Sequence, residues 1–358
     1  MKRKPHHGLS RRRFLSSTGA VAVGLTFLPY RARAQEEQKL NFYNWDTYIG
    51  ETTLADFQEA TGIVPQMDIF ADTDEMFAKF REGNPGYDVI VPSNDYVQRM
   101  IEADMLMPLD HDKIPNMANI GSRFLDPSFD PGRKYSLPYM WGTIGIGYST
   151  ERVPDTPDSW KILYDSGELS GKISLLAEAR TVIGLGMKYL GHSLNSNDPA
   201  HIAEATELLI AQKRHIKVFA DDNGQDLLAS GEVDLCQEWN GDIAQLMTED
   251  DTVNYIVPSE GSMLFEDDLA IPKGAPHPEN AHAFINYIFD AEAGAAIADF
   301  IQYATPNEAA RELMSDDYKN NPAIFPPDDV IAKCEPQNYE GEDVIRMFDE
   351  AWTRIQSA

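Results

Sequence analysis

The stretch Leu40-Asn41-Phe42-Tyr43-Asn44-Trp45 is rich in aromatic residues, which is typical of a β-strand. Leu54 and Phe57 then follow at a helical spacing, and Gly62 stands where a helix commonly ends. These residues open an alternation of strand, helix, strand, helix and strand, at residues 40–45, 53–60, 63–70, 73–82 and 87–91. Strands that alternate with helices favour a parallel sheet covered by helices. The sequence therefore predicts an α/β fold.

The same alternation returns after Gly171, which indicates a second lobe of similar architecture. The expected elements are a strand at 172–176, helices at 179–190 and 200–212, a strand at 233–239 and a helix from Asn240. A strand at 264–272 leads out of this lobe, followed by helices at 279–289, 291–300 and 343–355. The 324 residues from Gln35 onward exceed what one hydrophobic core usually supports. Two lobes are therefore expected.

The first 34 residues have the order of an export signal. Ser10-Arg11-Arg12-Arg13-Phe14-Leu15 is a twin-arginine signature, an apolar run follows at 21–28, and Ala32-Arg33-Ala34 is a small-residue cleavage site. A membrane-spanning helix needs roughly 20 apolar residues, which this run does not reach. We expect a signal peptide at 1–34 and a periplasmic protein with no stable membrane insertion.

The chain is strongly acidic once this segment is set aside. Eight of its 30 lysines and arginines precede Gln35 and none of its 58 acids does, so 22 positive and 58 negative side chains remain. Such a field repels nucleic acid and attracts small cations. Acidity also keeps an exported protein soluble, so charge alone does not select a ligand. Two cysteines, Cys236 and Cys334, are too few for a disulfide framework, and the apolar run before Cys236 favours a buried thiol.

Aromatic and acidic residues recur where the predicted strands end. They are Trp45 and Asp46, then Ser93, Asn94, Asp95 and Tyr96, then Glu178, then Trp239 and Asp242. Phe265, Glu266 and Asp267 continue the pattern at the next likely crossover between the lobes. In open α/β sheets, ligands bind beyond the carboxyl ends of the strands. Aromatic faces attract a cation and carboxylates give it charge-assisted hydrogen bonds, so this mixture predicts a site for an ammonium group with apolar walls.

Each of these residues also has an ordinary structural role. A tryptophan at a strand end commonly packs against the core, and an aspartate there commonly caps the next helix. Asp242 is well placed to be such a cap. The repetition of the pattern, rather than any single residue, favours a binding site.

Most of the chain, from about 41 to 352, resembles the polyamine-binding proteins of bacterial ABC importers. The matching motifs are Tyr43-Asn44-Trp45 with Tyr48, Tyr87-Asp88-Val89-Ile90-Val91-Pro92-Ser93, Leu137-Pro138-Tyr139-Met140-Trp141-Gly142, Ile144-Gly145-Ile146-Gly147, Trp239-Asn240-Gly241-Asp242, Asp267-Asp268-Leu269-Ala270-Ile271-Pro272 and Tyr303-Ala304-Thr305-Pro306-Asn307. The resemblance implies a type II periplasmic-binding-protein fold with two α/β lobes, a central ligand cleft and two hinge crossovers. It places residues 35–142 and 266–311 in the first lobe and 146–262 and 315–358 in the second.

The resemblance also implies roles for individual residues. Trp45, Trp239 and Tyr303 match aromatics that sandwich an alkyl chain, and Phe265 stands where the family has Trp or Phe. Asp267 matches the carboxylate that holds one amine. The other implied contacts are Tyr48, Ser93, Glu178, Asp242 and Gln337. We add Asp46 and Asp95, because they are acidic residues that follow the same predicted strands.

Four positions depart from the family pattern. Thr47 and Thr181 stand where the family usually has acids, Asp95 where an aromatic is common, and Glu266 where an apolar residue is common. An ammonium without a partner is costly to desolvate, so these changes alter the ligand that fits. The expected ligand is a putrescine-like or spermidine-like amine, and an agmatine-like amine or a metal ion is the alternative.

The sequence argues against an enzyme. It has no His-Glu-x-x-His and no nucleophile elbow, and Gly167-Glu168-Leu169-Ser170-Gly171-Lys172 has the wrong spacing for a phosphate-binding loop. We expect no catalytic residue, no metal site and no cofactor, because aromatic faces beside each acid serve no purpose for Ca²⁺ or Mg²⁺. The resemblance implies a monomer that works with an ABC permease and an ATPase. A periplasmic sensor with the same site would have the same sequence features.

Overall fold

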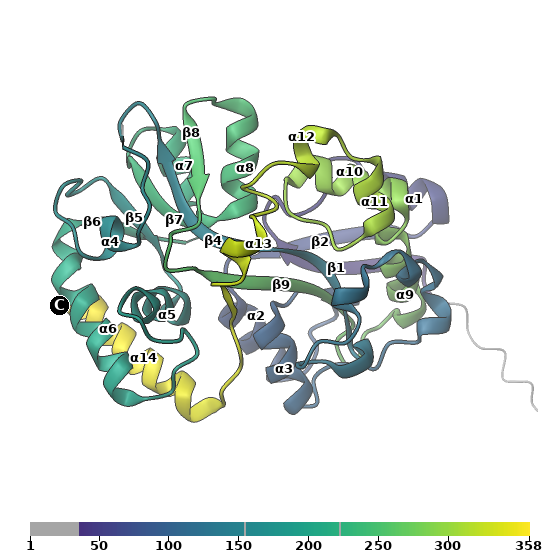
Figure 1. Cartoon of the computed structure of the whole chain (residues 1–358). Coiled ribbons are helices and arrows are strands. Elements are labelled where there is room, and N and C mark those ends of the chain that lie inside the picture. The colour runs from purple at the N-terminus through teal and green to yellow at the C-terminus, as the bar shows by residue number, and fades with distance from the viewer. Residues whose placement is uncertain (1–35, 154, 222) are drawn as a thin grey trace, which may run out of the picture. The chain divides into compact units, whose positions relative to one another are not determined.

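Ten strands are joined in one hydrogen-bonded sheet in the computed structural model, which describes residues 36–153, 155–221 and 223–358 (Figure 1). The main path runs in the order β2-β1-β3-β9-β4-β7-β5-β6, with β8 paired to β4 and β10 to β9. The predicted export signal lies outside the described residues. The α/β fold with two lobes is confirmed.

The first lobe is built around β1 (Lys39–Trp45), which pairs in parallel with β2 (Val64–Phe70) and β3 (Val89–Ile90). The antiparallel strand β9 (Met263–Ala270) continues this sheet. The helices of this part are α1 (Thr53–Thr61), α2 (Thr73–Phe80), α3 (Asn94–Glu102), α9 (Pro278–Ile288) and α10 (Ala291–Ile301). Because β1, β2 and β3 run parallel, the residues that follow β1 and β3 meet at one edge of the sheet.

A long buried strand, β4 (Ser136–Ser149), connects the two lobes. Residues 136–143 pair with β9, and residues 144–149 pair with β7 (Leu235–Trp239) and β8 (Val253–Ile256). The strand pattern did not predict β4, because glycine and proline are unfavourable inside strands. Gly142 is required by packing, since a Cβ there would collide with Asn240 and Phe265.

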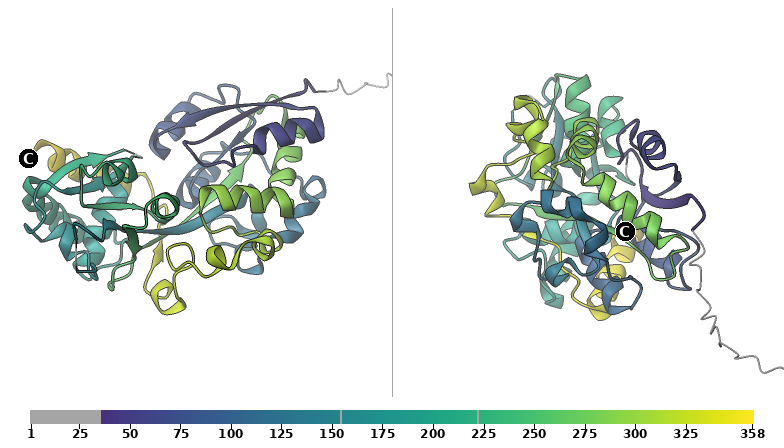
Figure 2. Two further views of the ribbon diagram at one scale, coloured as in Figure 1. Left: turned by 90° about the horizontal axis from the view of Figure 1, so that it is seen from above. Right: turned by 90° about the vertical axis from the view of Figure 1, so that its right-hand side faces the viewer.

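The second lobe carries the parallel strands β5 (Ile173–Leu176) and β6 (Ile216–Ala220) beside β7. Its helices are α4 (Lys161–Tyr164), α5 (Ala179–Tyr189), α6 (Pro199–Gln212), α7 (Gly224–Ala229) and α8 (Asn240–Glu249). The C-terminal helix α14 (Glu342–Ser357) packs on α5 and α6, and Figure 2 shows it at the end remote from β1 and α1. The chain therefore crosses into the first lobe through β9 and returns to the second at its C-terminus.

Short elements complete the connections. They are 3-10 turns at His111–Lys113, Pro115–Asn119, Ser122–Phe124, Pro131–Arg133 and Lys213–His215, helices α11 (Glu308–Leu313), α12 (Asp316–Lys319) and α13 (Asp328–Ile331), and strand β10 (Glu335–Pro336). In the part of the chain that the structure describes, no helix is both long and apolar enough to cross a bilayer.

The predicted helices and strands are present, with shifts of a few residues at their ends. The strand predicted at 87–91 is shorter, at Val89–Ile90; beside it, the Asp88 carboxylate accepts hydrogen bonds from the backbone N–H groups of Asn41 at 2.7 Å and His277 at 2.6 Å. Cys236 is a buried free thiol, as predicted, and Cys334 is also free. The residue bounds given above for the lobes stay a prediction.

Candidate functional site

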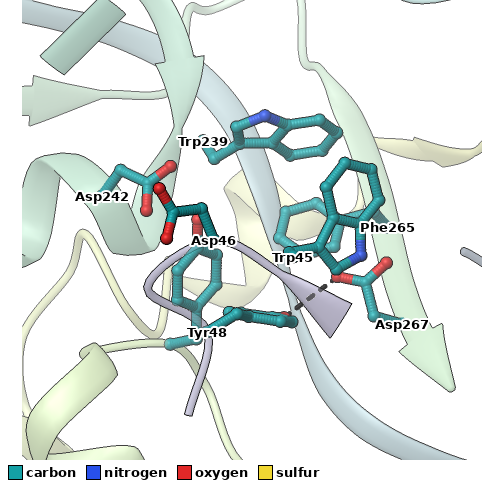
Figure 3. A pocket seen from close by; sticks show the side chains of 8 residues that line it. Trp45, Asp46, Tyr48, Trp239, Asp242, Phe265 and Asp267 are labelled. Carbon is teal, nitrogen blue, oxygen red and sulfur yellow. Dashed lines mark hydrogen bonds between the residues drawn. The ribbon is translucent and has the colours of Figure 1, made fainter. Parts of the chain in front are cut away.

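Eight of the predicted site residues line one pocket, which we call the central pocket (Figure 3). They are Trp45, Asp46, Tyr48, Trp239, Asp242, Phe265, Asp267 and Tyr303. The pocket encloses about 340 Å³ not filled by atoms, including solvent at its mouth. Its residues lie at or just after the end of β1, at the end of β7 and the start of α8, on β9, and between α10 and α11, so both lobes contribute.

Aromatic rings form the walls of the central pocket. Trp239 meets Phe265 edge to face with ring centroids 4.8 Å apart, and Tyr48 meets Tyr303 in the same way at 4.8 Å. The Trp45 indole N–H donates to the Val91 carbonyl at 3.1 Å, which fixes its orientation. Such rings provide flat apolar surfaces and negative π-faces to a cationic ligand.

Close contact between the lobes depends on a glycine. Gly241, in the first turn of α8, lies so near Tyr303 that a Cβ at this position would overlap the tyrosine ring. The family-like motif Trp239-Asn240-Gly241-Asp242 therefore has a steric basis: glycine allows the Tyr303 ring to complete the wall of the central pocket.

Asp267 provides the most deeply buried carboxylate of the central pocket. It is 7 % exposed, and it accepts hydrogen bonds from Ser93 Oγ at 2.9 Å and Tyr48 Oη at 3.0 Å. Burial raises the pKa of Asp267 to about 7, although the two hydroxyl donors oppose this shift. Ser93 is the N-cap residue of α3 but makes no side-chain cap, because its hydroxyl is directed to Asp267 instead. Ser93 is thus placed with the central pocket as a support for Asp267.

Asp46 and Asp242 lie on the other side of the rings from Asp267, and their carboxylates face the same space (Figure 3). Asp46 is exposed and accepts the Thr47 backbone N–H at 2.9 Å. The expectation that Asp242 caps a helix is wrong: the N-cap of α8 is Trp239, and Asp242 lies in the first turn. The central pocket therefore has carboxylates at both ends of an aromatic channel.

The opposite face of β9 has a different environment. Glu266 and Asp268 both form ion pairs with the fully buried Arg133, at 2.7 Å in the case of Asp268. Burial raises the pKa of both carboxyls, and Arg133 opposes the shift. Glu266, which departs from the family pattern, is therefore paired with a cation of the protein.

The remaining predicted residues surround a second cavity, which we call the distal pocket. Glu178 and Gln337 line it, and Gln337 Nε2 donates to Asp95 Oδ2 at 2.9 Å. Its full lining is Asp72, Thr73, Asp74, Tyr96, Ala177, Glu178, Ala179, Arg180, Thr181, Gln337, Ile345, Asp349 and Trp352. A smaller cavity has Trp239 in common with the central pocket, and Asp72, Ala177 and Glu178 in common with the distal pocket. Asp95, Glu178 and Gln337 are thus brought together away from the central pocket.

Sequence reasoning missed three residues around these cavities. Asp72 and Asp221 line the smaller cavity, and Arg180 lines the distal pocket, with its Nη1 4.0 Å from Asp95 Oδ2. Asp221 follows β6, a strand that the sequence pattern did not predict. Arg180 follows Glu178 and Ala179 at the start of α5, where nothing in the sequence distinguishes it from an exposed arginine.

The arrangement suits non-covalent capture of an amine. Ring faces and carboxylates can replace the water around methylene groups and an ammonium group, respectively. In the ranges 36–153, 155–221 and 223–358, no group of three or more His, Cys, Asp or Glu side chains is placed to hold a metal ion.

The chain is similar over most of its length to several bacterial binding proteins. It is 32 % identical to the putrescine-binding periplasmic protein PotF of Escherichia coli, covering 95 % of this chain and 97 % of that protein. It is 33 % identical to the spermidine/putrescine-binding periplasmic protein of Escherichia coli, covering 96 % and 98 %. A solved structure of a putative spermidine/putrescine ABC transporter protein from Listeria monocytogenes superposes with a TM-score of 0.86 at 34 % identity, covering 89 % and 99 %.

These likenesses extend over both lobes and both pockets. Residues 52–326 match the family described as bacterial extracellular solute-binding proteins. This range contains most of the residues that line the central pocket and the start of α5. With its two α/β lobes and the pocket lined from both, the chain belongs to the family of bacterial extracellular solute-binding proteins.

Proposed function

We propose that this protein captures a linear amine of the polyamine class, putrescine-like or spermidine-like, and delivers it to an ABC importer. One observation carries the proposal: Asp267 is buried among aromatic rings, and its hydrogen-bond donors are the two neutral hydroxyls of Ser93 and Tyr48. A buried carboxylate in this setting gains most from a cationic partner. Relatives that are named for putrescine or spermidine binding support the same ligand class.

The mechanism is capture without covalent chemistry. One ammonium group pairs with Asp267, the methylenes lie between Trp45, Trp239 and Tyr303, and a second ammonium is held by Asp46 and Asp242. Because Asp267 has a pKa of about 7, an incoming ammonium also favours its ionised form.

Residues from both lobes contact the ligand in this scheme, so binding favours a closed arrangement of the lobes about β4 and the segments that flank β9. A membrane permease then recognises the closed form, and a cytoplasmic ATPase powers release. Export by the twin-arginine route brings a monomeric receptor to the periplasm. This route is supported by the order of basic, apolar and small residues at 10–34.

Calorimetric titration tests the proposal. The ligands are putrescine, spermidine, spermine, agmatine and basic amino acids, and the proteins are wild type, Asp267→Ala and Trp239→Ala. We expect at least one amine to bind, and both substitutions to weaken it about 30-fold or more. Truncating one partner of a buried charge pair, as in Asp267→Ala, or a central aromatic contact, as in Trp239→Ala, costs roughly 2 kcal/mol or more. Asp349→Ala, in the distal pocket, is the matched control and should leave putrescine binding unchanged.

Two results would contradict the proposal. Binding of a metal ion or an anion, with no binding of any amine, would exclude the ligand class. Equal amine affinity in wild type and Asp267→Ala would leave the class in place and refute the site.

A further inference from the structure

A further cavity, which we call the hinge pocket, lies among the strands by which the chain passes between the lobes. Trp141 contributes to its lining from β4, Leu264 from β9 and Pro336 from β10. Both β4 and β10 pair with β9, so the three strands are adjacent here. The hinge pocket encloses about 580 Å³ not filled by atoms, including solvent at its mouth. Pockets that bind small molecules commonly have this size and lie between domains.

The walls of the hinge pocket are largely apolar. They include Phe124, Phe129, Trp141, Leu264, Phe265 and Ile331. Trp141 and Phe265 are buried, and the other four side chains are only partly buried, so they keep apolar surface in contact with water. Covering that surface with an apolar group of a ligand is favourable. The hinge pocket therefore suits a ligand with an aryl or branched-alkyl body.

Two of the three polar side chains that line the hinge pocket are engaged with the protein. Asn94 Nδ2 donates to the Gln337 carbonyl at 2.6 Å, and Glu266 is ion-paired with Arg133. The third is Arg123, which is exposed. Among the residues that the structure describes, none forms an ion pair with Arg123 or accepts a hydrogen bond from it. Its N–H groups are therefore available to a ligand.

The charge of Arg123 is only partly compensated by the protein. Its guanidinium carbon lies 4.1 Å from the centre of the Trp141 ring, and an arginine on a ring face can still present its N–H groups to a carboxylate. Partial burial lowers the pKa of Arg123, and the neighbouring Arg311 lowers it further. The attraction of three acids opposes this shift without cancelling it, and these acids are Glu266, Glu308 and Asp328. A carboxylate at the mouth of the hinge pocket would supply the missing compensation.

The hinge pocket is in contact with the central pocket through one side chain, because Phe265 lines both. The lobes also touch in this structure. Trp239 meets Phe265 edge to face, and Gln245 Nε2 of α8 donates to the Phe300 carbonyl of α10 at 3.0 Å. An amine held by both lobes favours this arrangement, and so does a ligand that fits the hinge pocket as this arrangement shapes it. Two ligands that favour the same arrangement raise each other's affinity.

We infer that the hinge pocket is an effector site for a small carboxylate with an aryl or branched-alkyl body. The body lies against Trp141 and Leu264, and the carboxylate pairs with Arg123. The effector role rests on the proposed function, because the bound carboxylate raises the affinity of the central pocket for its amine.

Calorimetric titration of the amine-free protein tests the site. The ligands are 3-phenylpropionate and 3-phenylpropan-1-ol, which share one body and differ in the charge of the head. We expect wild type to bind the carboxylate about tenfold or more tightly than the alcohol, because only the carboxylate gains charge-assisted hydrogen bonds from Arg123. Arg123→Met should remove this difference. Ile331→Trp, which fills the hinge pocket and leaves Arg123 in place, should abolish binding of both ligands.

Arg311→Met is the matched control. Arg311 also lies over an aromatic ring, that of Phe325 at 4.1 Å, and it is not part of the lining of the hinge pocket. This variant should keep the preference for the carboxylate over the alcohol.

A second titration tests the effector role. Putrescine is titrated into wild type and Arg123→Met, each with and without saturating 3-phenylpropionate. In wild type we expect the carboxylate to raise putrescine affinity about fivefold or more, which is the lower range of coupling between two sites. In Arg123→Met the carboxylate should leave putrescine affinity unchanged.

The outcomes separate the two proposals. Equal binding of the carboxylate and the alcohol by wild type, or no binding of either, would overturn the site. Equal binding of the carboxylate by wild type and folded Arg123→Met would overturn it as well. An unchanged or lower putrescine affinity in the presence of the carboxylate would overturn the effector role. Failure of every amine to bind wild type would overturn the proposed function and the effector role with it, whereas carboxylate binding is measured without an amine and is decided independently.

Discussion

The two faces of β9 place three consecutive acids in opposite environments. Glu266 and Asp268 point to one face, where Arg133 pairs with both. Asp267 points to the other, where Ser93 and Tyr48 donate neutral hydroxyl groups to it. One face therefore has a cation built into the protein, and the other has a buried carboxylate whose cation must come from outside. The difference shows how one strand can serve stability and ligand recognition together.

Removing the internal cation is the most severe test of this comparison. Arg133→Met leaves two buried carboxyls without their partner, so we expect the free energy of unfolding to fall by about 3–5 kcal/mol. Urea denaturation of the ligand-free protein measures this loss. Arg346→Met is the control, because Arg346 is 68 % exposed and its ion pair with Asp343 should contribute less than about 1 kcal/mol. Equal stability of Arg133→Met and wild type would show that the Arg133 face is not structural.

Neutralising Asp267, the acid on the ligand face, should raise the free energy of unfolding, whereas Arg133→Met lowers it. Folding raises the pKa of Asp267 from near 3.8 to about 7, so the folded state binds the proton more tightly and stability falls as the pH rises from about 4 to 7. Asp267→Asn lacks this loss, and we expect it to be more stable than wild type at pH 8 by about 1–3 kcal/mol. At pH 4 the difference should be small. Thermal unfolding at both pH values checks this, and a less stable variant at pH 8 would contradict it.

The pH dependence of ligand affinity should follow the protonation of the Asp267 carboxyl. Below pH 7 the binding of an ammonium must displace the Asp267 proton, so putrescine affinity should fall about tenfold for each pH unit from 7 to 5, or about 1.4 kcal/mol per unit. Above pH 7 it should level off. Calorimetry in buffers of different ionisation enthalpy should detect release of close to one proton at pH 6. A flat profile between pH 5 and 8 would exclude Asp267 as the ammonium partner.

Removing one hydroxyl donor is the mildest change. Tyr48→Phe deletes the 3.0 Å hydrogen bond to Asp267, which raises the pKa of Asp267 further and moves the pH midpoint of putrescine binding upward. We expect a loss of about 0.5–1.5 kcal/mol in binding at pH 8. Tyr139→Phe is the matched control, because Tyr139 Oη donates to the Tyr48 backbone carbonyl and not to Asp267. The same shift in both variants would show that general loosening, rather than the hydroxyl, is responsible.

Much of the fold could be read from local patterns. The helices α1, α5, α9, α10 and α14 and the strands β1, β2, β5 and β9 lie close to their predicted positions, because period and end signals are local properties of the chain. Strand β4 was not predicted from its pattern. Its glycines and proline are unfavourable in strands. The glycines Gly142, Gly145 and Gly147 are present because neighbouring segments approach so closely that a Cβ would collide with them.

The residue types of the site could be predicted from the sequence, but which of these residues line the same pocket could be predicted less well. Trp45 and Trp239 end β1 and β7, and such strand ends converge at one place in an α/β fold. Asp267 joins them from the middle of β9, the strand that runs beside β4 between the lobes. Asp95 and Gln337 were predicted in the site with Asp267, but they are hydrogen-bonded to each other near Arg180. The sequence contains no signal for that arrangement, since it depends on how α3, α5 and the segment after β10 meet.

The amino-acid sequence was sufficient to indicate an α/β chain with an acidic, aromatic crevice for a cation. Because side chains alternate along a strand, Asp267 faces away from Glu266 and Asp268 in β9. The sequence could not indicate which of the two faces would contain a cation. Arg133 lies 135 positions from Asp268 in the chain and Ser93 lies 174 from Asp267, so only folding brings each to its side of β9. The free energy of a buried charge depends on those distant neighbours, which is why recognition and stability separated only in three dimensions.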